Sequence, residues 1–270
     1  EPAFVADVEA SFGADAKSLD FAATQQALAA INGWVDTKTK GQIPEILSQI
    51  RQDERLFAVN AIYFKGRWRD QFDPKKTAQG PFHTAAGTTQ TVPFMHRTVK
   101  GTPHYEGEDF EAVDLWYGAG AHTMTILLPK PSTTADALAG RLSGAEFATI
   151  VQRMGEAEVE LYLPKLRLEY SKSLGETLSD LGMPTAFTDD ANFTGISAGG
   201  GLFITRVEHK TFVEVNEEGT EAAAATAVGV GLVSAPRQVT MRIDRPFLVI
   251  IRERLSGTIV FLGRINSIPT

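Results

Sequence analysis

The chain has 270 residues, of which 43% are hydrophobic and 22% are charged, and this is ordinary for a globular protein with a sizeable core. Its net charge of −7 repels phosphate backbones, so nucleic acid is not an expected partner. The absence of cysteine excludes disulfides, thiolate metal sites and cysteine nucleophiles.

No apolar run approaches the ~20 residues that a membrane helix needs, so we expect no membrane partner. The segment Glu1–Ala10 has neither the basic start nor the apolar stretch of a signal peptide. We also expect no metal, because the five histidines lack the close spacing that is typical of metal ligands, and we expect no cofactor. They are His83, His96, His104, His122 and His209.

Apolar residues at helical spacing predict helices at Pro2–Phe12 and Ala22–Asp36, with a short strand at Lys17–Phe21 between them. The pattern then changes. A nearly continuous apolar run within Arg55–Trp68 predicts a strand that is buried on both faces. Further strands are expected at Thr91–His96, Phe110–Trp116 and Thr123–Leu128.

In the second half of the chain, segments with helical spacing of apolar residues alternate with segments that have strand-like spacing. Helices are predicted at Thr134–Arg153 and Leu174–Leu181. Strands are predicted at Glu158–Tyr170 with an interruption at Pro164, and at Leu202–Val215, Val239–Ile243, Phe247–Ile251 and Thr258–Ile265. Because helices come first and strands then dominate, without βαβ alternation, the sequence favours α+β architecture.

The segment Leu202–Pro236 starts as a strand and ends as a run of Ala, Thr, Val and Gly. One interpretation is an exposed helix or linker, since alanine has the highest helix propensity. The other is a loop built to become a strand. In that case alternate residues would point to one face of a sheet, and all of them are small: Thr220, Ala222, Ala224 and Thr226.

With these residues in view, the sequence resembles the serpin family along its whole length. The hinge from Glu217 to Ala225 (Glu-Glu-Gly-Thr-Glu-Ala-Ala-Ala-Ala) resembles that of inhibitory members. The other matching motifs are Asn32-Gly-Trp-Val, Thr39–Ile43, Phe57–Trp68, Leu163–Leu166, Met241–Ile251 and Phe261–Arg264.

This resemblance implies an α+β serpin-like fold with a large central mixed β-sheet, further β-sheets and surrounding helices. Residues 1–270 would form a single domain with a reactive-centre loop at about 217–238. The domain would be N-terminally incomplete, because serpins carry a block of helices and strand before the first match.

The implied function is serine protease inhibition rather than catalysis. A protease attacks the loop, forms an acyl-enzyme, and is trapped when the cut loop inserts into the main sheet. The family pattern places the bond fourteen residues after Gly219, at Val233–Ser234, to within two residues. The apolar residue there suits an elastase-like or subtilisin-like protease. An extracellular monomer that can form loop-sheet polymers is the expected state.

The resemblance also implies roles for individual residues. The hinge and insertion region comprises Glu217, Glu218, Gly219, Thr220, Glu221, Ala222, Ala223, Ala224, Ala225 and Thr226. The region where the sheet opens comprises Asn60, Trp68, Lys165 and His209. An ion pair between Lys165 and Glu217 would help to hold the sheet closed, and Asn60 and His209 would belong to a polar cluster at mid-sheet.

Other readings stay open. The protein could be a serpin-fold carrier or chaperone, or a protease substrate that does not inhibit. A remote alternative is a hydrolase, because Gly195–Gly199 fits the nucleophile-elbow pattern with Ser197 at its centre. That motif belongs between a buried strand and a helix, whereas here its neighbours are typical of turns.

Overall fold

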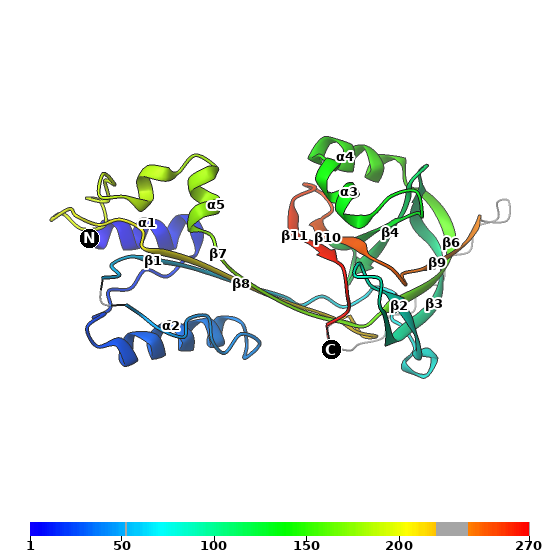
Figure 1. Cartoon of the computed structure of the whole chain (residues 1–270), viewed down its shortest axis with the longest axis horizontal. Helices are drawn as coiled ribbons and strands as arrows, with labels where there is room; N and C mark the ends of the chain where they lie inside the picture. The colour runs from blue at the N-terminus through cyan, green and yellow to red at the C-terminus, as the bar shows by residue number, and fades with distance from the viewer. Residues whose placement is uncertain (52, 220–236, 270) are drawn as a thin grey trace. The chain divides into compact units, whose positions relative to one another are not determined.

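The structure is a computed structural model, and it describes residues 1–51, 53–219 and 237–269. The chain divides into two compact units (Figure 1). Unit 1 comprises Glu1–Tyr63 and Leu168–Phe212, and unit 2 comprises Phe64–Arg167 and Val213–Thr270. Within the described ranges, no helix has the length and apolar character needed to cross a membrane.

Unit 1 contains helices and most of a three-stranded sheet with the order β1-β8-β7. The strands are β1 (Phe57–Phe64), β7 (Leu166–Ser173) and β8 (Arg206–Val215), and the helices are α1 (Pro2–Phe12), α2 (Thr24–Lys38), α5 (Gly175–Asp180) and the 3-10 helix η2 (Pro184–Phe187). The sheet order puts β1 directly beside β8.

The core of unit 1 forms between α2, the segment after it and the strands. Its fully buried members are Val35, Ile43, Ile46, Leu47 and Phe212. Asn32 fixes the segment after α2, because its side-chain oxygen accepts hydrogen bonds from the amides of Ile46 and Leu47, each at 3.0 Å. The Asn-Gly-Trp-Val motif therefore has a direct structural role.

Unit 2 contains a mixed eight-stranded sheet with the order β11-β10-β5-β4-β3-β6-β9, and β2 pairs with β3. The pairing of β6 with β9 is parallel, and the other strand pairings in this sheet are antiparallel. The strands are β2 (Ala78–His83), β3 (Thr89–Glu106), β4 (Phe110–Tyr117), β5 (His122–Pro129), β6 (Gly155–Pro164), β9 (Gln238–Arg242), β10 (Phe247–Glu253) and β11 (Ile259–Ile265), and the 3-10 helix η1 (Pro74–Lys76) precedes them.

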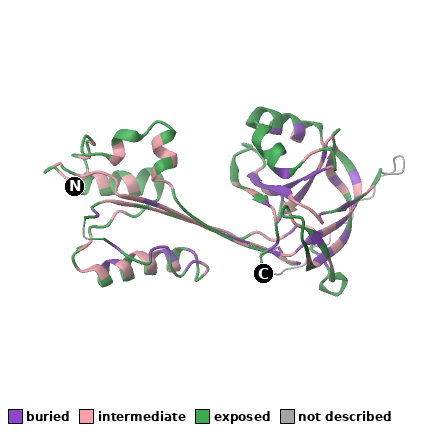
Figure 2. Cartoon of the chain, in the orientation of Figure 1, coloured by how far each residue is buried: buried purple, intermediate pink, exposed green. Residues whose placement is uncertain are grey.

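Two helices of unit 2, α3 (Ala135–Arg141) and α4 (Gly144–Arg153), pack on one face of this sheet (Figure 1). They bury a shared cluster that consists of Phe110, Ala112, Leu127, Ala135, Leu138, Phe147, Ile150, Leu248 and Ile250. Figure 2 shows that strands of this sheet carry much of the buried surface of the unit. One part of the core of unit 2 thus lies between the two helices and the sheet.

Most of the predicted elements are confirmed, and so is the α+β class with a mixed sheet. Three expectations were wrong. Lys17–Phe21 forms no strand, and β1 is nowhere buried, since its residues are exposed or half-buried. The predicted helix Thr134–Arg153 is two helices, because Ser143 and Glu146 form a capping box that starts α4.

Candidate functional site

A tight turn follows β8 and reverses the chain. The amide of Gly219 donates to the carbonyl of Asn216 at 3.2 Å, and the amide of Glu218 donates to the side-chain oxygen of Asn216 at 3.1 Å. Gly219 has φ of 82°, in the left-handed region that glycine adopts without a steric penalty. Asn216 therefore provides the acceptors at the start of the turn, and Gly219 provides the left-handed conformation at its end.

The backbone of a neighbouring segment also lies very close to Gly219. A β-carbon at this position would lie 2.3 Å from the amide nitrogen of Trp68 and 2.6 Å from the carbonyl oxygen of Gly66. Both are backbone atoms, so no side-chain rotation can make room. Sterics and backbone conformation thus independently require glycine here.

The close approach lets the turn bond to the segment that contains Trp68. The amide of Trp68 donates to the carbonyl of Glu218 at 3.3 Å, and its indole nitrogen donates to the carbonyl of Asn216 at 2.9 Å. The amide of Phe72 donates to the carbonyl of Glu217 at 3.0 Å. Trp68 is only 3% exposed and stacks on Tyr117 at 4.4 Å, so it joins the turn to the core of unit 2.

The carboxylate of Glu217 is buried and has a partner on each oxygen. Lys165 approaches one oxygen at 2.8 Å, and the hydroxyl of Thr77 donates to the other at 2.7 Å. Burial opposes ionisation, but these hydrogen bonds and the charge of Lys165 outweigh it, so the pKa of Glu217 lies below its usual value. Glu217 is therefore ionised at neutral pH and bonded to three different segments of unit 2.

We call this group the hinge site, and it comprises Trp68, Phe72, Thr77, Lys165 and residues 216–219. It brings together Trp68, Lys165 and Glu217, which the sequence singled out by resemblance. Phe72, Thr77 and Asn216 were not foreseen. Only Asn216 had a signal, because asparagine just before a Glu-Glu-Gly run is a common turn former.

In unit 1, Asn60 on β1 and His209 on β8 form a pair across neighbouring strands. The distance from His209 Nδ1 to Asn60 Oδ1 is 2.9 Å, which requires Nδ1 to carry the proton. Burial lowers the pKa of His209, so the ring is neutral at physiological pH.

The remaining predicted site residues lie outside the described residues, and their roles stay predictions. They are Thr220, Glu221, Ala222, Ala223, Ala224, Ala225, Thr226, Val233 and Ser234. Ser197 is described, and it lies among turns between η2 and β8 rather than between a strand and a helix. The strand–turn–helix context that a nucleophile elbow requires is therefore missing around it.

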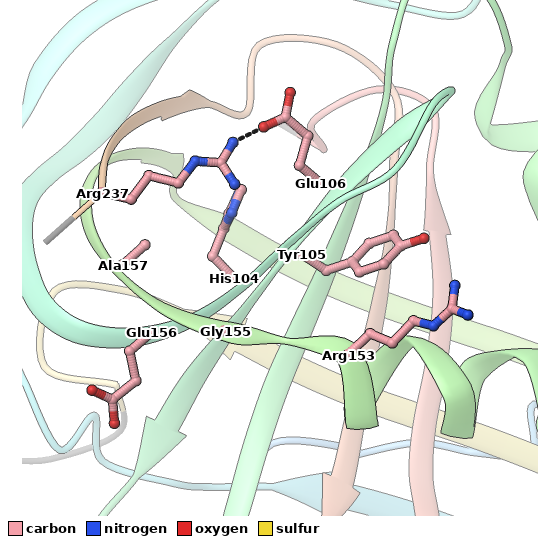
Figure 3. Close-up of a pocket in the computed structure, with 8 residues that line it drawn as sticks. All are labelled: His104, Tyr105, Glu106, Arg153, Gly155, Glu156, Ala157 and Arg237. Atoms are coloured by element: carbon pink, nitrogen blue, oxygen red, sulfur yellow. Dashed lines mark hydrogen bonds and ion pairs between the residues drawn. The ribbon is translucent and has the colours of Figure 1, made fainter.

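Unit 2 also has a cavity of about 470 Å³ beside the start of β6 (Figure 3). Its charged groups do not converge, because Glu156 and Arg153 point away from each other. The carboxylate of Glu106 is engaged by Arg237 and Lys130, and the imidazole of His104 contacts Glu111 at 3.4 Å. The arrangement joins the residue before β9 to β3, and the described lining residues offer no set of groups aimed at one reacting atom.

Comparison with known proteins gives a family match over nearly the whole chain. The model described as "Serpin (serine protease inhibitor)" matches residues 1–268. A serpin-like protein of Thermococcus kodakarensis is 40% identical over 93% of this chain, and the chain spans 59% of that protein's length.

Two further proteins are similar. The leukocyte elastase inhibitor of Sus scrofa is 38% identical over 98% of this chain and 73% of its own length. The structure of human thyroxine-binding globulin matches with a TM-score of 0.88 at 27% identity, over 99% of this chain and 71% of that one.

Replacing Gly219 tests the crowding of the turn. We expect Gly219→Ala to lower the free energy of unfolding by roughly 3 kcal/mol, since it adds a backbone clash to the cost of a positive φ. Gly87→Ala is the matched control, because Gly87 has a similar φ of 78° but open space around it. Urea denaturation of both variants measures the difference, and an equal loss in the two would contradict the crowding.

The ionised carboxylate of Glu217 should make the stability of the protein depend on pH in the acid range. Its pKa is below the ordinary value of 4.5, so its stabilising contribution is complete above pH 4.5 and is lost as the pH falls through the folded-state pKa. Denaturation between about pH 5 and pH 3 should therefore show a shallower loss of stability for Glu217→Gln than for the wild type. Glu218→Gln at the exposed neighbour is the control, and identical slopes for E217Q and wild type would refute the assignment.

Proposed function

Because the chain belongs to the serpin family, we propose that it inhibits a serine protease as a suicide substrate, with Gly219–Pro236 as the bait. The observation that carries this proposal is the hinge site. It holds the chain through Glu217 and Gly219 immediately before a run of small residues. The similarity to a leukocyte elastase inhibitor supports a protease as partner.

The proposed first step is ordinary acyl transfer. The serine oxygen of the protease attacks the carbonyl carbon of Val233, the bond from that carbon to the nitrogen of Ser234 breaks, and the leaving amine takes a proton. Val233 is then esterified to the protease, and Ser234 becomes a new N-terminus. Leu232 and Val233 are medium-sized and apolar, which suits elastase-like and subtilisin-like proteases.

The proposed second step is insertion of the cut segment into the three-stranded sheet. The turn at residues 216–219 reverses the chain at the end of β8, so a returning strand would lie antiparallel to β8. β1 and β8 are neighbours in the sheet, so they must separate to admit it. The bond between Asn60 and His209 joins these two strands and would have to break.

The hinge site must be weak enough to rearrange during this step. Lys165 is 39% exposed, so its ion pair with Glu217 is worth only about 1 kcal/mol or less. The backbone hydrogen bonds to Trp68 and Phe72 each contribute a similar, modest amount. A set of small contributions keeps the sheet closed before cleavage and can be broken in sequence afterwards.

The proposal also includes the domain extent, the site of action and the oligomeric state that the family resemblance implies. Residues 1–270 act as one serpin domain, with the loop at about 217–238 and an extracellular site of action. The chain is a monomer that can form polymers when the loop of one molecule adds to the sheet of another. Ser197 has no part in the activity.

A carrier function is the second candidate, because the fold matches thyroxine-binding globulin at a TM-score of 0.88. The small residues from Thr220 to Thr226 weigh against it, since they are those that a sheet accepts most easily. A carrier does not need a covalent bond to a protease, so adduct formation separates the two functions.

The direct test mixes the protein with an elastase-like and a subtilisin-like protease and analyses the products by denaturing gel and mass spectrometry. We expect a stable covalent adduct and a released C-terminal peptide that starts near Ser234. Cleavage at that bond without an adduct would make the chain a substrate and exclude inhibition. A loop that resists both proteases would exclude its role as bait.

Alternation along the inserting segment gives a sharper test. Ala224→Arg places a charged side chain on the face shared by Thr220, Ala222 and Thr226, whereas Ala223→Arg places it on the opposite face. We expect A224R to abolish adduct formation while it is still cleaved, and A223R to retain most of it. Equal adduct yields for A224R and A223R would contradict insertion as an alternating strand.

A further inference from the structure

Arg97 is a buried cation, and two of its nitrogen atoms have no hydrogen-bond partner among the described residues. It lies on β3 opposite Leu161 of β6, and it is only 7% exposed. These two atoms are Nε and Nη1. The guanidinium carbon lies 4.4 Å from the ring centre of Phe72, which covers one face of the group but provides no acceptor for Nε or Nη1.

The charges around Arg97 do not neutralise it. Asp70 acts to raise its pKa and Arg69 acts to lower it, while burial, the largest influence, brings the pKa to about 10. The guanidinium therefore remains charged at neutral pH. The carboxylate of Asp70 is bonded to Arg69 at 2.9 Å, so it is already engaged.

A charge in this state is costly unless it has a counter-ion. Burying an unpaired ion costs several kcal/mol, and buried charges are normally paired and hydrogen-bonded. A guanidinium presents planar donors that match carboxylate, phosphate and sulfate oxygens. The side chains of Arg69 and Asp70 are 36% and 43% exposed, so solvent reaches the neighbouring positions.

We propose that Arg97 is the binding site for a small oxyanion, of the sulfate, phosphate or carboxylate type, with Arg69 as a second cation nearby. The position links the anion to the hinge site, because Arg97 stacks on Phe72 and the amide of Phe72 holds the carbonyl of Glu217. A bound anion therefore stabilises the closed arrangement of residues 216–219. This binding does not depend on protease inhibition.

Equilibrium dialysis with radiolabelled sulfate tests the site, at an ionic strength held constant with sodium chloride. We expect one saturable site per chain in the wild type, with competition by phosphate and by acetate. Arg97→Gln should weaken binding at least tenfold, and Arg153→Gln, which removes an exposed arginine of the same unit, should leave it unchanged. Asp70→Asn should tighten binding several-fold, because it removes the nearest competing carboxylate.

Competition identifies the chemistry that the site prefers. Stronger displacement by acetate than by phosphate assigns the site to carboxylates, and the reverse order assigns it to phosphate or sulfate. Should R97Q fail to fold, Arg97→Lys keeps the charge without the planar donors and should weaken binding several-fold. Absence of saturable binding to the wild type, or equal binding by wild type and a folded Arg97 variant, overturns the proposal.

Discussion

At Gly219 the main chain lies against the backbone of residues 66–68 so closely that only a hydrogen fits on the α-carbon. The bonds from the turn to its support accompany this approach. It brings the carbonyls of Glu217 and Glu218 within reach of the amides of Phe72 and Trp68. It also directs the carboxylate of Glu217 to Lys165 and Thr77.

The hinge site combines a rigid support with modest bonds. Trp68 is buried and stacked on Tyr117, so the support is part of the core. The bonds from the turn to that support are backbone hydrogen bonds and a partly exposed ion pair, which are individually weak. This combination suits the proposed mechanism, in which the turn is held before cleavage and released afterwards. Arg97 contacts the ring of Phe72, so an anion bound at the proposed site would act next to the hinge site.

The sequence predicted the order of elements well, because long periodic segments determine helices and strands with little help from tertiary context. It predicted the site residues Trp68, Lys165 and Glu217 only through family resemblance, and their contacts needed coordinates. Thr77 lies 140 positions from Glu217, and no local sequence pattern predicts that a threonine will bond to a carboxylate so distant in the chain. Apolarity marked β1 as a strand but could not show what covers its faces. The break between α3 and α4 could have been predicted from the sequence, because Ser143 and Glu146 have the spacing of a capping box.

Thermal unfolding of the intact and the loop-cleaved protein tests the central claim most directly, namely that β1 and β8 are held together until cleavage lets a new strand enter between them. An added strand gains backbone hydrogen bonds along its length, so cleavage near Val233 should raise the unfolding midpoint by tens of degrees. Gly219→Ala should alter the midpoint of the intact form more than that of the cleaved form. A cleaved protein that unfolds at the same temperature as the intact one, or below it, would contradict the account.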